Sequence, residues 1–470
     1  MDIEASSYVE PVKKEVDDDG KSKRTGDVVT ATTHIITVVV GAGVLALAWA
    51  MAQLGWIAGV GAMLAFSSIS IITYNFIADC YRYPDPVTGK RNYTYMQAVH
   101  SYLGGKMHVF CGLVLYGKLA GVTVGYAITT STSLLAIKKA SCFHHKGPDA
   151  DCKFSNNPYI IGFGILQIFL SQIPNFHKLT WLSTLAAATS FGYAFIGSGL
   201  SLAMVIQGKG HPTRLYGVPV GPDLTAADKI WRVFSALGNI ALACSFATVV
   251  YDIMDTLKSD PPENQQMKKA NVLGITMMTA LFLACGGLGY AAFGDNTPGN
   301  ILSGFGSYGS FWLVAIGNIC IAIHILGAYQ VMAQPFFRIV EMGANMMWPD
   351  SDFINKEYPT NLGLFKFNLN LFRSTWRTIF VILGSIIAMA MPFFHEFLAL
   401  LGAIGFWPLI VFFPIQMHIA QKQIKVGSLK WCALQLLNFI CFCVTVVASI
   451  GAIREIGKNI NKFKIFTYKQ

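Results

Sequence analysis

Long apolar segments recur along the whole chain and alternate with short polar ones. The hydrocarbon core of a bilayer requires roughly 20 apolar residues in a helix, and eleven segments reach or approach that length. The polar–apolar alternation of a membrane β-strand is absent. The pattern predicts an all-α integral membrane protein with about eleven transmembrane helices, at residues 31–51, 56–78, 107–137, 158–174, 178–207, 230–257, 270–293, 309–333, 376–397, 398–420 and 431–453.

The composition supports a membrane protein and disfavours a nucleic-acid partner. Of 470 residues, 53% are hydrophobic and 13% are charged, whereas roughly a quarter of an average soluble domain is charged. The net charge of +10 could suggest nucleic-acid binding, but the Lys and Arg residues stand in short clusters between apolar segments. We interpret these clusters as topology signals and expect a lipid bilayer as the surroundings.

The distribution of charge predicts the orientation of the chain. No apolar stretch precedes residue 31, so we expect no cleavable signal peptide. If the N-terminus is inside, the loops on the inner side carry more Lys and Arg than the loops on the outer side. This bias predicts a cytosolic N-terminus. The side of the basic C-terminal tail stays open, because eleven spans place it outside whereas ten or twelve would place it inside.

Two of the predicted spans are interrupted by residues that do not favour a membrane helix. Gly41-Ala42-Gly43 lies near the middle of the first span, where it suits either a helix break or close helix packing. The sixth span contains Gly238 and several polar residues, namely Asn239, Ser245, Tyr251, Asp252 and Asp255. Irregular helices five spans apart indicate an inverted repeat, in which both breaks meet near the bilayer midplane and form the substrate site.

This interpretation divides the chain into five parts. They are a cytosolic tail (1–30), a first repeat (31–207), an outer loop (208–229), a second repeat (230–420) and an added span with a tail (421–470). No HExxH or similar set of catalytic groups is present, so we do not expect an enzyme. A channel or receptor with the same number of spans remains an alternative to a transporter.

Several longer motifs occur in one order along residues 25 to about 450. Together they resemble the plant amino acid permeases of the amino acid/auxin permease family. The motifs are HIITVVVGAGVLALAWAMAQLGWIAG (34–59), ADCYR (78–82), DPVTGKRNYTYMQAV (85–99), SQIPNFHKLTWLS (171–183), DTLKSDPPENQQMKKA (255–270), GYAAFGDNTPGN (289–300), IHILGAYQV (323–331), NLNLFRSTWRTIFVI (368–382) and LLGAIGFWPLIVFFP (400–414).

The resemblance implies a leucine-transporter-like fold with five-helix inverted repeats and a final added helix. It implies a proton-coupled importer of amino acids in the plasma membrane, driven by the proton gradient with no bound cofactor. An auxin or other organic-acid carrier on the same fold is the alternative. The substrate-binding positions that it implies are Gly41, Ala42 and Gly43 for the carboxylate, Ala243, Ser245 and Phe246 for the amino group, and Tyr116 and Asn318 as pocket walls, although Asn318 equally suits a bond to a neighbouring helix.

Ionisable residues within the apolar segments are candidates for proton coupling, because burying a charge in lipid is costly. We single out His34, Lys118 and Asp252, and we expect Asp252 to be the counter-ion of Lys118. His324 is better explained as a neutral histidine between helices. Asp255 is expected to pair with Lys258, three residues further on.

Three positions depart from the pattern that the resemblance implies. Asn239 and Gln416 stand where acids are typical, and Lys118 stands where an uncharged residue is typical. These changes make the membrane interior more positive. We therefore expect a preference for neutral or anionic substrates.

Cys142 and Cys152 share a polar loop with His144 and His145. These residue types could bind zinc, but an oxidising outer face favours a disulfide between the two cysteines.

Overall fold

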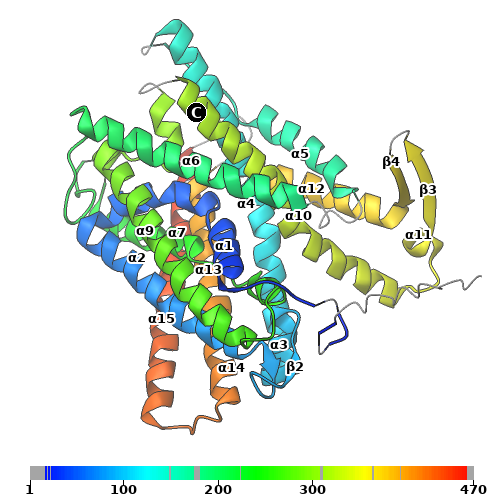
Figure 1. Ribbon diagram of the computed structural model, residues 1–470. Helices are drawn as coiled ribbons and strands as arrows, with labels where there is room; N and C mark the ends of the chain where they lie inside the picture. Colours follow the sequence, from blue (N-terminus) through cyan, green and yellow to red (C-terminus); the bar gives the residue numbers. More distant parts are fainter. Residues whose placement is uncertain are drawn as a thin grey trace, which may run out of the picture.

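The computed structural model is a bundle of long helices with two small hairpins (Figure 1). It describes residues 16–462, apart from 18, 22, 148–149, 174–179, 223, 307–310, 363–364 and 392. The beginning of the predicted tail, the last eight residues and part of the SQIPNF motif lie outside the described residues. Within the described part, eight helices are long and apolar enough to cross a membrane.

The elements follow one another in the order below, with η marking short 3-10 or π turns. They are α1 (Val28–Val39), η1 (Ala42–Ala46), α2 (Leu47–Asp79), β1 (Arg82–Tyr83), β2 (Lys90–Arg91), α3 (Tyr95–Leu103), α4 (Gly105–Lys146), α5 (Asn157–Ser171), α6 (Thr180–Ile206), α7 (Ala226–Ala243), α8 (Val250–Met254), α9 (Glu263–Phe293), η3 (Gly294–Asn296), η4 (Ile301–Gly306), α10 (Phe311–Met347), α11 (Asp352–Asn355), β3 (Glu357–Leu362), β4 (Phe365–Asn370), α12 (Leu371–Ala390), α13 (Phe394–Phe406), η5 (Trp407–Phe412), α14 (Phe413–Gln421) and α15 (Leu429–Lys462).

The first predicted span is broken in the middle. Helix α1 begins after Asp27, whose side chain accepts a hydrogen bond from the N–H of Thr30, and it ends at Val39. The chain leaves the helix at Val40 and Gly41 and resumes in η1, which continues directly into α2. The interruption lies where the glycines predicted it.

The end of the first span and the second span meet at a corner at Gly55, where the backbone of α2 is not helical. This residue has φ 76°, which side chains with a Cβ rarely adopt. A Cβ at Gly55 would also lie 2.2 Å from the backbone nitrogen of Gly217 and 2.4 Å from the carbonyl oxygen of Leu215. The sequence predicted two separate spans at 31–51 and 56–78, and the non-helical Gly55 lies between them.

The sixth span is broken as well. Helix α7 ends at Ala243, residues 244–249 are not helical, and α8 begins at Val250. Helix α7 crosses α13 with backbones in contact, because a Cβ at Gly238 would lie 2.3 Å from the carbonyl oxygen of Ala399. Glycines of this kind permit close helix crossings in membranes.

Large apolar side chains cover the outside of the bundle. Leu113 of α4, Phe169 of α5, Trp312 of α10 and Phe439 of α15 are each more than 60% exposed. A surface of this kind suits contact with lipid rather than water.

The antiparallel hairpin β3–β4 was not predicted. It lies between α11 and α12 and extends beyond the ends of the helices (Figure 1). Its two six-residue strands are much shorter than a membrane-spanning segment and so do not appear in the pattern of long apolar segments.

Candidate functional site

The two helix breaks touch each other. A Cβ at Gly43 would lie 3.2 Å from Cα and 3.3 Å from the backbone nitrogen of Ala243. Ala42 and Ala243 are buried, whereas a Cβ at Gly41 would meet no atom within 4 Å. Residues 200 positions apart in the sequence therefore meet at one point inside the bundle.

Aromatic hydroxyl groups fix the backbone on both sides of this contact. The hydroxyl of Tyr193 donates to the carbonyl oxygen of Val40 at 3.1 Å, and the N–H of Phe246 donates to the hydroxyl of Tyr74 at 2.7 Å. No side chain caps the start of η1 at Gly41. The first N–H groups of a helix lack partners within it and carry partial positive charge, so this helix start is suited to a carboxylate.

Lys118 of α4 reaches the break in the sixth span. Its ammonium donates to the hydroxyl oxygen of Ser245, and its side chain lies against Gly405 of α13, where a Cβ would come within 2.8 Å of Cδ. Lys118 is buried, and within the described chain it forms no ion pair with an Asp or Glu. The expected pairing with Asp252 is wrong, and Asp252 is exposed on α8.

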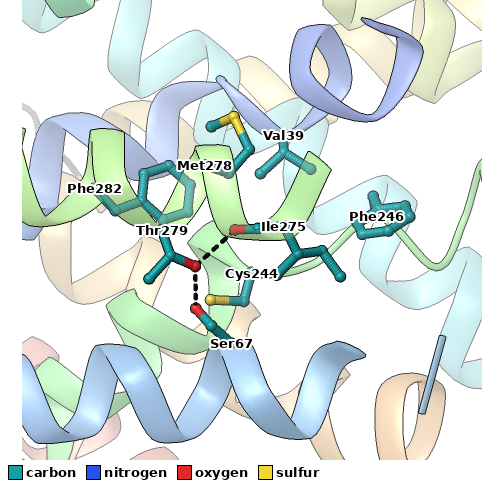
Figure 2. Close-up of a pocket in the computed structure, with 8 residues that line it drawn as sticks. All are labelled: Val39, Ser67, Cys244, Phe246, Ile275, Met278, Thr279 and Phe282. Carbon is teal, nitrogen blue, oxygen red and sulfur yellow. Dashed lines mark hydrogen bonds between the residues drawn. The ribbon is translucent and has the colours of Figure 1, made fainter. Parts of the chain in front are cut away.

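A small cavity with a volume of about 10 Å³, enough for about one water molecule, lies beside the breaks (Figure 2). The hydroxyl of Thr279 lies 2.7 Å from the hydroxyl of Ser67 and 2.7 Å from the carbonyl oxygen of Ile275, so the polar groups of the lining already have partners. The remaining surface is mostly apolar and suits an uncharged group. The lining residues are Val39, Ser67, Cys244, Phe246, Ile275, Met278, Thr279 and Phe282.

The two predicted pocket walls lie elsewhere. The ring of Tyr116 packs against that of Phe336 on α10, with 6.3 Å between centroids. The amide nitrogen of Asn318 donates to the carbonyl oxygen of Val314 in its own helix. Neither residue lines the cavity of Figure 2.

The two histidines have different surroundings. His34 is exposed on α1. His324 is buried, and its Nδ1 lies 2.7 Å from Oγ of Ser190 and 3.1 Å from the carbonyl oxygen of Ala186. These contacts agree with the interpretation of His324 as a structural histidine between α10 and α6.

A buried amide near the break was not assigned to the site. Asn239 is 1% exposed, and neither its amide nitrogen nor its amide oxygen has a hydrogen-bond partner among the described residues. It stands four residues before Ala243 and so shares a helix face with it. Buried polar groups are normally paired, so Asn239 is a candidate to contact a bound molecule.

An ion cluster at the start of the chain was missed. The guanidinium of Arg24 contacts Asp17 at 2.9 Å, Asp19 at 2.7 Å and Asp255 at 2.6 Å. The hydrogen bond from Arg24 holds the pKa of Asp19 well below its usual range. The expected pairing of Asp255 with Lys258 is wrong, because Asp255 points to Arg24, more than 200 residues away in sequence.

Cys142 and Cys152 form a disulfide with a Cα–Cα distance of 6.0 Å. It joins the end of α4 to the segment before α5. Within the described residues, no group of three or more His, Cys, Asp or Glu side chains could hold a metal ion.

Solved structures show the class to which this fold belongs. The chain is similar to MhsT in complex with L-phenylalanine, with a TM-score of 0.52 and 12% identity over 92% of this chain and 99% of that one. It is also similar to the inward-facing conformation of Mhp1, with a TM-score of 0.52 and 11% identity over 95% and 93% of the two chains. The fold is that of the leucine-transporter-like membrane transporters.

The sequence comparisons define the family within this class. The family of transmembrane amino acid transporter proteins matches residues 24–456. Amino acid permeases 1 and 8 of Arabidopsis thaliana are 53% and 52% identical to this chain over 96% of its length, and the matches cover 94% and 96% of the relatives. The chain belongs to the transmembrane amino acid transporter family.

Proposed function

We propose that this protein imports amino acids across the plasma membrane, driven by the proton gradient and working by alternating access. The observation that carries the proposal is the contact of Gly43 with Ala243, which places two interrupted helices together inside a chain of this family. Such breaks offer partial charges of both signs near the middle of a membrane. An amino acid carries the matching pair of charges.

The proposed binding mode follows from the backbone at the two breaks. The substrate carboxylate would accept hydrogen bonds from the start of η1 at Gly41, Ala42 and Gly43. The ammonium group would donate to carbonyl and hydroxyl oxygens between Ala243 and Phe246. The open space at Gly41 supports this arrangement, because a ligand atom can approach the backbone there.

Lys118 bears on the charge of the preferred substrate. Its ammonium lies at the break in the sixth span and has only the neutral hydroxyl of Ser245 as a described hydrogen-bond partner. Every amino acid brings an α-ammonium, which the carbonyl oxygens of the break would hold. A further cation, on the side chain of lysine or arginine, would add repulsion from Lys118. This supports our expectation that neutral or anionic amino acids are preferred.

The proposed topology has a cytosolic N-terminus, repeats at 31–207 and 230–420, and an outer loop at 208–229. Labelling of single introduced cysteines with a membrane-impermeant reagent checks it. Position 209 should be labelled from outside in intact cells, whereas position 258 should be labelled only after permeabilisation. Labelling of both positions in intact cells would contradict the orientation.

The transport function is tested in cells that lack amino acid uptake of their own. Labelled neutral, acidic and basic amino acids are supplied at about pH 5.5 and about pH 7.5, with auxin as the competing substrate class. We expect saturable accumulation of amino acids against their gradient, faster at the lower pH. Uptake of auxin without amino acid uptake would overturn the substrate class, and pH-independent uptake would overturn proton coupling alone.

A further inference from the structure

A pair of adjacent titratable residues begins α13, outside the substrate site. Nδ1 of His395 lies 3.2 Å from Oε2 of Glu396. The side chain of His395 is 22% exposed and that of Glu396 is 6% exposed. Under the proposed topology this end of α13 faces outward, so the imidazole is reachable from the outer solution and the carboxylate lies behind it.

The ring of His395 packs against the first broken span. Its centroid lies 4.1 Å from that of Trp49, the third residue of α2, which follows directly on η1. On another side the ring is confined by the segment between η3 and η4, where a Cβ at Gly299 would lie 2.3 Å from Nδ1. A change of charge on the imidazole therefore acts electrostatically on the helix that starts at the proposed carboxylate site.

The charged groups around the pair come from α7 and α15. Oε1 of Glu396 accepts a hydrogen bond from Asn459 at 2.5 Å. Arg232 of α7 and Glu455 of α15 act electrostatically on His395, and these two groups lie 3.5 Å apart. The other cations on this part of α15, Arg454 and Lys458, pair with Asp228 of α7. The neighbouring residue of α2 is Trp49, which does not titrate.

The arrangement of charge in this cluster favours a proton on the pair. With His395 neutral, the three carboxylates and three cations named above balance in number, but Arg454 and Lys458 lie against Asp228, so Glu396 and Glu455 share the guanidinium of Arg232. One of the buried oxygens of Glu455 has no hydrogen-bond partner in the described chain. Charge is costly in a low-dielectric interior, so the binding of one proton by the pair compensates the carboxylate that has no cation of its own.

The same helix also reaches the second break. A Cβ at Gly402 of α13 would lie 2.0 Å from the carbonyl oxygen of Gly238 and 2.7 Å from the backbone nitrogen of Leu242. Leu242 is the penultimate residue of α7. Helix α13 thus contacts both interrupted spans, the first through His395 and the second through Gly402.

We propose that His395 and Glu396 together bind the proton that drives transport. This deepens the proposed function and rests on it. The proton is taken from the outer solution by the imidazole and shared with the carboxylate, and it leaves toward the inner side after the helices rearrange. No other bond is made or broken, so the step balances as one proton bound and one released.

The test compares Glu396→Gln and His395→Gln with wild type and with His211→Gln, an exposed histidine in the proposed outer loop. In wild type and His211→Gln, the apparent KM should fall several-fold between about pH 7.5 and about pH 5.5. Glu396→Gln mimics the protonated carboxyl group. It should give a KM that does not depend on pH and should exchange substrate without accumulating it, while His395→Gln should shift the midpoint of the pH curve by about one unit or more.

The proposal is overturned if the apparent KM of both variants stays within about twofold of the wild-type value at each pH. If a variant fails to reach the membrane, tryptophan emission decides instead. The difference in emission between wild type and Trp49→Phe should change with pH, because an imidazolium beside the indole alters its emission, and a constant difference overturns the proposal. Wild-type uptake that is independent of pH would instead refute proton coupling itself. The absence of all amino acid uptake would refute the proposed function.

Discussion

At the scale of single residues, the site depends on small side chains and on groups without partners. Gly43 allows the two breaks to approach to van der Waals contact. Asn239 is buried near them with no hydrogen-bond partner among the described residues, and Lys118 is buried there with the neutral hydroxyl of Ser245 as its partner. Each of these features allows a direct test by substitution.

Gly43→Val should abolish uptake. Even a single Cβ would lie 3.2 Å from Cα of Ala243, and the two further methyl groups of valine have no space unless the breaks separate. The matched control is Gly61→Val on α2, where a Cβ meets no atom within 4 Å. We expect a loss of at least about tenfold for the first variant and less than about twofold for the control, measured as uptake per molecule at the cell surface.

Lys118→Met should change charge selectivity. Glutamate and glutamine have nearly the same shape, so the ratio of their uptake rates reports the effect of the cation. Removal of the charge should lower the glutamate-to-glutamine ratio by about tenfold, equivalent to about 1.4 kcal/mol, while Lys118→Arg retains it.

Lys139→Met, further along α4, is the control for a change in net charge. A ratio in Lys118→Met equal to that of wild type would show that Lys118 does not contact the part of the substrate that differs.

The sequence predicted the positions of the breaks but not the partners of the charged residues. Gly41 and Gly43 are unusual within a single apolar segment, so local reasoning was sufficient to identify them. Asp255 was assigned to Lys258 by proximity in sequence, and Lys118 was assigned to Asp252 by charge. The actual contacts with Arg24 and Ser245 depend on the packing of segments more than 100 residues apart, which no local pattern records.

At the scale of elements, the segment before α1 is held to the end of α8 by Arg24. This arginine is buried and contacts three carboxylates, while Tyr81 of the loop after α2 donates to the same carboxylate of Asp255. Removal of one partner from a buried ion cluster leaves uncompensated charge, typically at a cost of about 3 to 5 kcal/mol. The cluster therefore fixes the start of the first span to the end of the sixth.

Arg24→Gln should release this segment. Hydrogen exchange of the amides of residues 19–28 should accelerate by about tenfold or more, whereas Lys356→Gln, which removes an exposed pair with Asp352, should leave them unchanged. Equal protection in wild type and Arg24→Gln would show that the cluster does not hold the segment.

The same cluster should not contribute to pH dependence near neutrality. The pKa of Asp19 is lowered in the folded protein, so its stabilising contribution is complete above the usual Asp pKa of about 3.9 and is lost only as the pH falls below that value. Protection of residues 19–28 from hydrogen exchange, corrected for intrinsic rates, should be constant between about pH 5.5 and about pH 7.5. A fall in protection over this range would contradict the assignment of pH sensitivity to the opposite end of the bundle.

At the scale of the whole molecule, the helical class and the approximate spans followed from apolar segment length alone. The length criterion placed a boundary between residues 51 and 56, and the two arms of α2 meet there at the non-helical Gly55. It also missed β3–β4 because the hairpin lies outside the apolar bundle. Long-range order in this protein is set by contacts between helices, and these are absent from the hydrophobic pattern.

Replacement of both Cys142 and Cys152 by serine should destabilise the protein without altering its substrate preference. The disulfide closes a short loop of sequence separation 10 at the end of α4, and bonds of this kind typically contribute about 2 to 4 kcal/mol. Tm in detergent should fall by several degrees. A reducing agent should lower the Tm of wild type to that of the variant and leave the variant unchanged; no effect on wild type would contradict a structural role.

The corner at Gly55 has a mechanical consequence. Backbone hydrogen bonds fasten the 214–218 strip across it, from Val218 to Ala52 at 3.0 Å and from Ile57 to Leu215 at 3.2 Å. Because the strip is hydrogen-bonded to both arms of α2, we expect a tilt of the arm next to η1 to move the other arm and the strip as well. A probe attached at position 216 is therefore expected to report occupancy of the distant proposed substrate site through the movement of the strip.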